Sequence, residues 1–209
     1  MCIRDSPTPG ESVSVGTFYK LFDAPIETVV IPSAQLSVEP RNAERARNYG
    51  IEIDGRKDLS FFGGAGEDYF VAGNVALINS QITLPDDPQV ILTNDVRPLQ
   101  GQSPYVLNVS AGWDDLDGKG SLVAALNVFG RRINEVGAFL ADDTYELARP
   151  QLDVVGRIAL GGGFALSAKA RNLWAVPKRT RVGELMLVTN PTPFEASLSL
   201  RWQAQVRDP

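Results

Sequence analysis

The side chains that most often carry enzyme chemistry are scarce in this sequence of 209 residues. It contains no histidine and a single cysteine, Cys2. These counts exclude a Ser-His-Asp triad, a Cys-His nucleophile, a zinc site of cysteines and histidines, and a disulfide framework. Chemistry by a carboxylate pair, by a Ser-Lys pair or by a bound cofactor remains possible. We therefore predict a protein that is not an enzyme, with no catalytic residues, no metal site and no cofactor.

A phosphate-binding motif is also missing from the sequence. Gly161, Gly162 and Gly163 follow one another without the G-x-G-x-x-G spacing of a dinucleotide-binding loop, so they predict a tight turn. The formal net charge is −5, and the basic residues are scattered along the chain. Proteins that bind nucleic acid concentrate Lys and Arg on one surface. We therefore expect no nucleic-acid partner.

The composition favours a fold with many turns. Hydrophobic residues make up 44% of the chain, and 19 glycines and 14 prolines separate short apolar stretches. No apolar run approaches the length of a membrane-spanning helix, about 18 residues, and the best candidate, Phe70–Ile78, is interrupted by Gly73 and Asn74. Strands of a membrane β-barrel need only about ten residues each and alternate in polarity. An all-β fold is therefore expected.

Apolar and polar residues alternate in eight segments, as along a β-strand with one apolar face. The last segment is the clearest, because Leu200 and Trp202 alternate with Arg201. The longest segment carries Arg47 and Lys57 on its apolar parity, which indicates that both of its ends project beyond an apolar zone. The expected strands are Ser12–Ile26, Arg45–Phe61, Asp68–Gln81, Tyr105–Asp114, Ser121–Val128, Gln151–Leu160, Phe164–Arg171 and Phe194–Gln203.

The connections between these segments alternate between short and long. The short ones are Gly63–Glu67, Asp115–Lys119 and Gly161–Gly163. The long ones are Glu27–Glu44, Ile82–Pro104, Arg131–Pro150 and Trp174–Pro193. Bacterial outer-membrane barrels have short periplasmic turns and longer extracellular loops. The alternation therefore predicts a membrane barrel segment with all four long connections on the extracellular side.

In such a barrel the apolar side chains face lipid and the polar ones line the lumen. Tyr105, Trp113 and Trp202 lie near strand ends with apolar parity, as expected for an aromatic girdle. A soluble sandwich or lipocalin-type barrel alternates as well, but its apolar side chains point inward and its charges are simply solvated. The residues expected to face the lumen are Glu52, Asp54, Arg56, Asn74, Asn108, Asn127, Asp153, Arg157, Lys169, Arg171 and Arg201.

Seven sequence motifs, in order along the chain, resemble those of one protein family. They are FYKLFDAPIE (Phe18–Glu27), NYGIEIDGRKDLSFF (Asn48–Phe62), NVALINSQI (Asn74–Ile82), RPLQGQSPYVLN (Arg97–Asn108), AALNVFGRRINEVG (Ala124–Gly137), ARPQLDVV (Ala148–Val155) and AKARNLW (Ala168–Trp174). With these motifs the chain from Ser12 to Trp202 resembles the carboxyl-terminal part of the barrel of a TonB-dependent outer-membrane receptor.

The resemblance implies an antiparallel transmembrane segment of about eight strands from a twenty-two-stranded barrel. It implies a receptor that imports scarce, bulky solutes such as siderophores, cobalamin or glycans, in the outer membrane of a Gram-negative bacterium. The implied partners are outer-membrane lipid, the barrel assembly machinery, and a plug domain that is missing from this sequence. Through the plug, TonB-ExbB-ExbD would supply the energy for import.

Both ends of the chain are expected to lie outside this barrel segment. Met1–Ser6 (MCIRDS) resembles translated sequencing-adapter read-through and has no secretory-signal pattern, so residues 1–11 are expected to be an artefactual or disordered start. The barrel segment spans residues 12–202. Residues 203–209 are expected to be a carboxyl-terminal extension, because barrels of the family end at an aromatic residue such as Trp202.

The long connections are where the resemblance implies ligand capture. The residues expected near ligand are Arg97, Gln100, Arg131, Arg132, Asp142, Asp143 and Tyr145. Two alternatives stay open: a complete eight-stranded outer-membrane barrel with a structural or adhesive role, and a soluble lipocalin-like binder. If the chain is a barrel segment, its two outer strands lack neighbours, so we expect it alone to aggregate or to form a curved open sheet.

Overall fold

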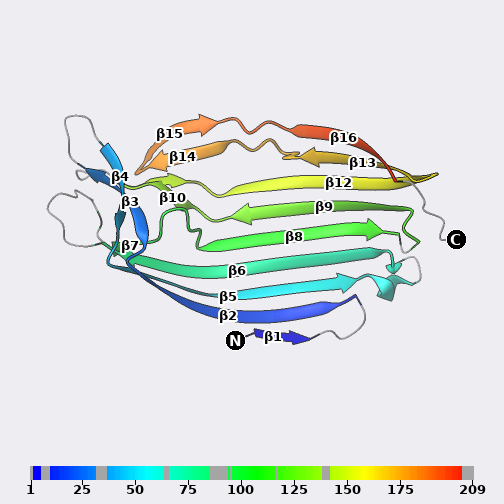
Figure 1. Ribbon diagram of the computed structural model, residues 1–209, viewed down its shortest axis with the longest axis horizontal. Helices are drawn as coiled ribbons and strands as arrows, with labels where there is room; N and C mark the ends of the chain where they lie inside the picture. The colour runs from blue at the N-terminus through cyan, green and yellow to red at the C-terminus, as the bar shows by residue number, and fades with distance from the viewer. Residues whose placement is uncertain are drawn as a thin grey trace.

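Residues 2–5, 10–31, 37–63, 66–84, 94, 96–115, 117–137 and 142–203 are described in a computed structural model of the chain (Figure 1). They form three antiparallel sheets and no α-helix. A short 3-10 helix, η1 (Ser60–Phe62), follows one of the long strands. In the described ranges no helix is long and apolar enough to cross a membrane. The predicted all-β, antiparallel fold is confirmed.

The main sheet contains ten strands, eight of which are the predicted ones. The eight pair in chain order, each with the next, so the sheet is a meander, and Figure 1 shows the long strands side by side. A two-residue strand, β7 (Val96–Arg97), pairs with one of them. The predicted strands are β2 (Ser12–Asp23), β5 (Arg45–Asp58), β6 (Tyr69–Thr83), β8 (Tyr105–Asp114), β9 (Gly120–Phe129), β12 (Arg149–Gly161), β13 (Phe164–Arg171) and β16 (Glu195–Trp202).

Two strands end earlier than predicted, each for a local reason. β2 stops at Asp23 because Ala24 adopts a left-handed conformation with φ of 46°, which turns the chain out of the ladder. β5 stops at Asp58 because the carboxylate of Asp58 accepts hydrogen bonds from the backbone N–H and the hydroxyl of Ser60. This Asx-type turn leads into η1.

The first strand of the sheet was not predicted. β1 (Cys2–Asp5) pairs with β2, with Cys2 opposite Gly16 and Asp5 opposite Val13. The expectation that residues 1–11 lie outside the fold therefore does not hold for these four residues. The physical reason is that the free edge of β2 offers a row of backbone N–H and C=O groups, which pair with a neighbouring segment largely independently of its side chains.

The main sheet is open. Among the described strands its order runs β1-β2-β5-β6-β8-β9-β12-β13-β16, and no described pairing joins β16 to β1 or β2. Eight strands are enough to close a small barrel, but these eight do not close on one another. The sheet thus has the open form that was expected for a barrel segment on its own.

The pairing register gives the main sheet one apolar and one polar face. Residues directly opposite each other in an antiparallel ladder project to the same side of the sheet. Val15, Ile53, Val75, Leu107 and Val128 form one such row across five strands, and all are apolar. We call this side the apolar face and the opposite side the polar face. A one-residue slip would exchange the two faces, so the alternation itself fixes the register.

The two ends of the main sheet differ. The short connections lie at one end, which we call the turn end, and the long connections lie at the other, which we call the loop end (Figure 1). The long connections form two further sheets that the sequence did not predict. These are the pair β3 (Ile26–Ile31) and β4 (Ser37–Asn42), and the four-stranded sheet of β10 (Arg132–Glu135), β11 (Thr144–Glu146), β14 (Lys178–Val182) and β15 (Leu185–Asn190).

A small cluster of buried apolar side chains lies at the loop end. Ala43, Ala46, Ile82 and Leu84 form this cluster, and Leu99 packs against it. Ile82 and, in the adjoining four-stranded sheet, Ile133 are the largest side chains that are fully buried in the described structure. Elsewhere in the main sheet the buried apolar side chains are those of Phe70, Ala76 and Ala165, outside this cluster. The loop end therefore holds the main interior of the described structure.

At the turn end, Lys119 organises the connection between β8 and β9. Its backbone N–H donates a hydrogen bond to the Asp115 carboxylate over 2.7 Å, and its ammonium donates to the Asp117 carboxylate. The hydrogen bond and the charge of Lys119 hold the pKa of Asp117 below its usual value. Gly118 adopts a φ of 74°, a conformation that residues with a Cβ rarely take.

Replacing Gly112 by alanine is expected to destabilise the main sheet by about 1–3 kcal/mol. A Cβ at this position would lie 2.8 Å from the ring of Phe70, its cross-strand partner, and 2.9 Å from the carbonyl oxygen of Leu122. Moving Phe70 also disturbs Arg56, whose guanidinium lies 3.8 Å from that ring. The change is measured as a shift of the urea unfolding midpoint in detergent micelles.

The matched control is Gly16→Ala in β2, where a Cβ would meet no atom within 4 Å. Gly16 lies in the same kind of strand interior, so its replacement should leave the midpoint unchanged or raise it slightly. Equal midpoints for the two alanine variants would contradict the proposed packing of Phe70 over Gly112.

Candidate functional site

The apolar face of the main sheet is exposed. Val13 is 50% exposed and Leu198 is 71% exposed, although both belong to the apolar parity of their strands. In β2 the apolar side chains are more exposed than the polar ones: Val13 and Val15 are exposed, whereas Ser12 and Ser14 on the polar face are half-buried. An exposed apolar patch that extends across many strands marks a membrane or protein contact surface.

Aromatic side chains lie at both ends of the apolar face. At the turn end the register brings Tyr69 opposite Trp113 and Phe164 opposite Trp202, whose ring centroids are 6.3 Å apart. At the loop end Tyr19 lies opposite Tyr49, also with centroids 6.3 Å apart, and Tyr105 begins β8. The predicted girdle residues are Tyr105, Trp113 and Trp202, and all three lie on this face.

Four further members of these aromatic rows were not predicted from the sequence: Tyr19, Tyr49, Tyr69 and Phe164. Their parity along each strand was the signal that could have found them, since each alternates in step with the apolar residues. Tyr105 and Trp113 are eight residues apart on β8, which is about 27 Å at 3.4 Å per residue. In outer-membrane barrels, whose strands tilt by about 40°, a strand segment of this length would rise about 21 Å, and the apolar band of such barrels is ~25 Å tall.

All eleven side chains predicted to face a lumen share the polar face. Some of them lie directly opposite one another in the ladder, as Asp54 and Asn74 do. Others lie opposite a further residue of the polar face, as Arg157 lies opposite Ser167. The members are Glu52, Asp54, Arg56, Asn74, Asn108, Asn127, Asp153, Arg157, Lys169, Arg171 and Arg201. The polar face therefore groups these side chains on one side of the sheet.

Three asparagines form a hydrogen-bonded row across the polar face. The side-chain amide of Asn108 donates to the side-chain oxygen of Asn74 over 3.3 Å, and the amide of Asn127 donates to the oxygen of Asn108. Beside them the amide of Gln151 donates to both oxygens of Asp153 over 3.2 Å. These residues line a concavity of about 430 Å³. Amides and carboxylates together supply donors and acceptors for a polar partner surface.

An ionic network joins the strands of the four-stranded sheet at the loop end. Arg132 donates from Nε and Nη2 to one carboxylate oxygen of Glu146, over 3.1 and 3.0 Å. The ammonium of Lys178 lies 3.5 Å from the same oxygen, and it also donates to the side-chain oxygen of Asn134. Glu146 is buried, and the positive charges of Arg132 and Lys178 compensate its negative charge. Glu146 and Lys178 lie 32 positions apart in the chain, and neither was predicted as a site residue.

Several residues expected near ligand are bound within the fold. Arg97 is buried and its Nη2 lies 2.6 Å from a carboxylate oxygen of Glu27, which is also buried. The amide of Gln100 donates to the backbone carbonyl of Asn134 over 2.8 Å. Asp143 is buried and accepts a hydrogen bond from the backbone N–H of Gly137 over 2.9 Å. Through these contacts Arg97, Gln100 and Asp143 connect separate segments of the loop end.

The other candidates lie closer to the surface. Arg131 is exposed, and its guanidinium lies 5.2 Å from the ring centroid of Tyr145, within the range of a cation–π contact. Asp142 is exposed as well, whereas Arg132 is half-buried in the network with Glu146. Arg131 and Asp142 are thus the predicted ligand residues that are exposed at the loop end, and Tyr145, like Arg132, is half-buried.

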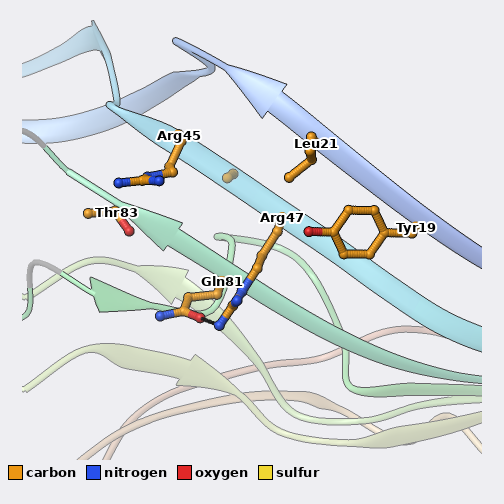
Figure 2. A pocket seen from close by; sticks show the side chains of 7 residues that line it. Tyr19, Leu21, Arg45, Arg47, Gln81 and Thr83 are labelled. Atoms are coloured by element: carbon orange, nitrogen blue, oxygen red, sulfur yellow. Dashed lines mark hydrogen bonds between the residues drawn. The ribbon is translucent and has the colours of Figure 1, made fainter.

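A hollow of about 280 Å³ lies where the apolar face meets the loop end (Figure 2). Figure 2 shows the side chains of Arg45 and Arg47 from β5 directed toward Thr83 and Gln81 of β6. The guanidinium of Arg47 donates a hydrogen bond to the side-chain oxygen of Gln81. The lining residues are Tyr19, Leu21, Arg45, Ala46, Arg47, Gln81 and Thr83. Two cations therefore border an exposed apolar surface.

Metal chemistry has no candidate among the described residues. Over these ranges no group of three or more His, Cys, Asp or Glu side chains is placed to hold a metal ion.

The chain was also compared with known proteins. No protein-family model matches it, and no curated protein is similar enough to count as a relative.

Proposed function

We propose that this chain forms part of the wall of an outer-membrane β-barrel. The proposed parent is a TonB-dependent receptor that actively imports a bulky solute such as a siderophore, cobalamin or a glycan. The observation that carries the proposal is the exposed apolar face, with aromatic rows at both ends and a polar face on the other side of the sheet.

A sheet with one exposed apolar face needs an apolar environment on that side. In water an exposed apolar surface is unfavourable by roughly 25 cal/mol for each Å², so the apolar face of a soluble sheet packs against a second layer. In a membrane barrel the same face contacts acyl chains and the polar side chains turn to the lumen. Rows of tyrosine and tryptophan near the two interfaces are typical of that arrangement.

The pairing order supports a large barrel over a small one. A self-contained eight-stranded barrel needs β16 to pair with β2 or β1, and the described order runs open from β1 to β16. A lipocalin-like binder directs its apolar side chains inward, whereas in β2 the apolar set is the more exposed one. Both features fit a segment of a wider wall.

The transport role rests on the family resemblance and on the two chemically distinct regions. In the proposed receptor the polar face, with its row of Asn74, Asn108 and Asn127, holds the plug by hydrogen bonds. Arg131 and Tyr145 at the surface of the loop end contribute to ligand capture. TonB-ExbB-ExbD acts through the plug to release it for import.

Lipid contact is tested by tryptophan fluorescence in vesicles whose acyl chains carry bromine, a short-range quencher. Variants that keep only Trp113 or only Trp202 are expected to be quenched strongly, since both lie on the apolar face. The matched control places the only tryptophan at Asn127, on the polar face, where quenching should be weak. Equal quenching at the two faces, or none at Trp113 and Trp202, would contradict the proposal.

The receptor assignment is tested separately by the genomic sequence that surrounds the coding region. A plug domain in frame ahead of Ser12 is the expected result. A secretory signal directly ahead of Ser12 would instead identify a small complete barrel and would overturn the receptor assignment.

A further inference from the structure

Two arginines interrupt the apolar face at its loop end. Arg45 and Arg47 share the parity of Tyr49 and Ile51 on β5, and Arg47 lies opposite Leu21 and Gln81. Along β5 toward the loop end the side chains of this face therefore change from aliphatic at Ile51 to aromatic at Tyr49 and to cationic beyond it, where Asp23 of β2 lies opposite Arg45. Acyl chains, interface and phosphate follow one another in the same order across a lipid leaflet.

The hollow beside these arginines has hydrogen-bond donors to spare. A guanidinium carries five N–H donors in a planar fork that matches the oxygens of a phosphate. Among the described contacts, Arg47 donates to Gln81 and Arg45 donates to Glu44 over 3.0 Å. The pair formed by Arg45 and Glu44 is exposed, so its exchange for another anion costs little. Gln81 uses its oxygen for Arg47 and keeps its amide nitrogen as a further donor.

We propose that this hollow binds the phosphorylated headgroup of a lipid in the leaflet next to the loop end. Arg45 and Arg47 hold the phosphate, Gln81 orients Arg47, and Tyr19 and Leu21 contact the first part of the acyl region. The inference rests on the proposed function, because it requires the apolar face to lie in lipid. The headgroup site goes beyond that function, because a barrel wall can span the membrane without one.

The test measures binding of diphosphoryl lipid A to the full chain in phosphatidylcholine vesicles, with retained lipid counted by mass spectrometry. The double variant Arg45→Gln/Arg47→Gln is expected to bind about thirty-fold more weakly, which corresponds to about 1 kcal/mol for each basic residue near an anionic lipid. The same lipid without its phosphates should bind the unmodified chain as weakly as the diphosphoryl form binds the double variant.

Two further variants serve as controls. Arg157→Gln/Arg201→Gln removes the same charge from the polar face and should leave lipid A binding unchanged. Glu44→Gln removes the anion that competes for Arg45 and should tighten binding about fivefold. An excess of inorganic phosphate is added in a further arm, and it should not displace the lipid, because acyl contacts with Tyr19 and Leu21 contribute to binding.

The outcomes separate this proposal from the proposed function. If the Arg45→Gln/Arg47→Gln variant retains lipid A as well as the unmodified chain does, the headgroup site is wrong. Displacement by inorganic phosphate would identify a site for free phosphate and would also overturn it. Bromine quenching of Trp113 in the same vesicles reports on lipid contact by itself. Quenching with unchanged lipid A binding rejects only the headgroup site, whereas loss of quenching rejects the membrane assignment.

Discussion

Replacing Leu126 by arginine is expected to destabilise the chain in lipid vesicles by about 2–4 kcal/mol, the cost of an arginine near the midplane on the lipid face of an outer-membrane barrel. Leu126 lies in the middle of β9, opposite Val109 and Leu152 on the apolar face. In the proposed orientation the new guanidinium has no water within reach. The free energy of unfolding from vesicles, measured by urea titration, gives the change.

Ala125→Arg provides the matched control one residue away. Ala125 lies on the polar face, is exposed, and is opposite Ser110 and Asp153. An arginine at this position meets water and the Asp153 carboxylate, so its cost should stay below about 1 kcal/mol. A larger penalty for Ala125→Arg than for Leu126→Arg would show that the polar face is the buried one and would contradict the proposed wall.

The strands and their two faces were predictable because they depend on local sequence. A side-chain period of two residues assigns each residue of a strand to a face without any knowledge of its neighbours. The register then follows, because pairing Ile53 with Val15 and Val75 keeps all apolar side chains together. The same alternation placed Trp113 and Trp202 on the apolar face before the pairing was known.

The structure inside the long connections could not be predicted in this way. Their strands are short, and β11 (Thr144–Glu146) has only three residues, too few for an alternation to be recognised. The four-stranded sheet also pairs β11 with β14, which follows more than thirty positions later in the chain. Pairing between such distant segments depends on tertiary packing, to which a local pattern is blind.

The burial of two predicted ligand residues at the loop end could not be foreseen for a related reason. Arg97 and Asp143 are charged and lie in connections, and these two features predict solvated side chains. Arg97 pairs with Glu27, which lies 70 positions earlier, and it lies opposite Ile82 in the ladder of β6 and β7. Only the fold brings these groups together. A charged residue in a long connection can thus be part of the interior when the connection forms its own sheets.

The buried ion pair of Arg97 and Glu27 at the loop end is the second place where a substitution is expected to change the stability strongly. Replacing Glu27 by alanine is expected to destabilise the chain by about 3–5 kcal/mol, the cost of leaving a buried charge without its partner. The side chain of Arg97 is 1% exposed. Its Nη1 donates to the backbone carbonyl of Pro98 over 3.2 Å, and its Nε has no hydrogen-bond partner in the described structure, so the compensating charge comes from Glu27. The urea unfolding midpoint in detergent micelles measures the loss.

Two further variants distinguish the cost of an unpaired buried charge from the cost of losing an ordinary contact. Glu184→Ala removes an exposed partner of Arg181, at 2.8 Å, and should change the stability by less than about 1 kcal/mol. The double variant Glu27→Leu/Arg97→Met removes both buried charges and should recover most of the stability lost in Glu27→Ala. If the double variant is as unstable as the single one, the loss comes from packing around the pair. Recovery instead shows that the stability lost in Glu27→Ala comes from leaving the buried charge of Arg97 without its partner.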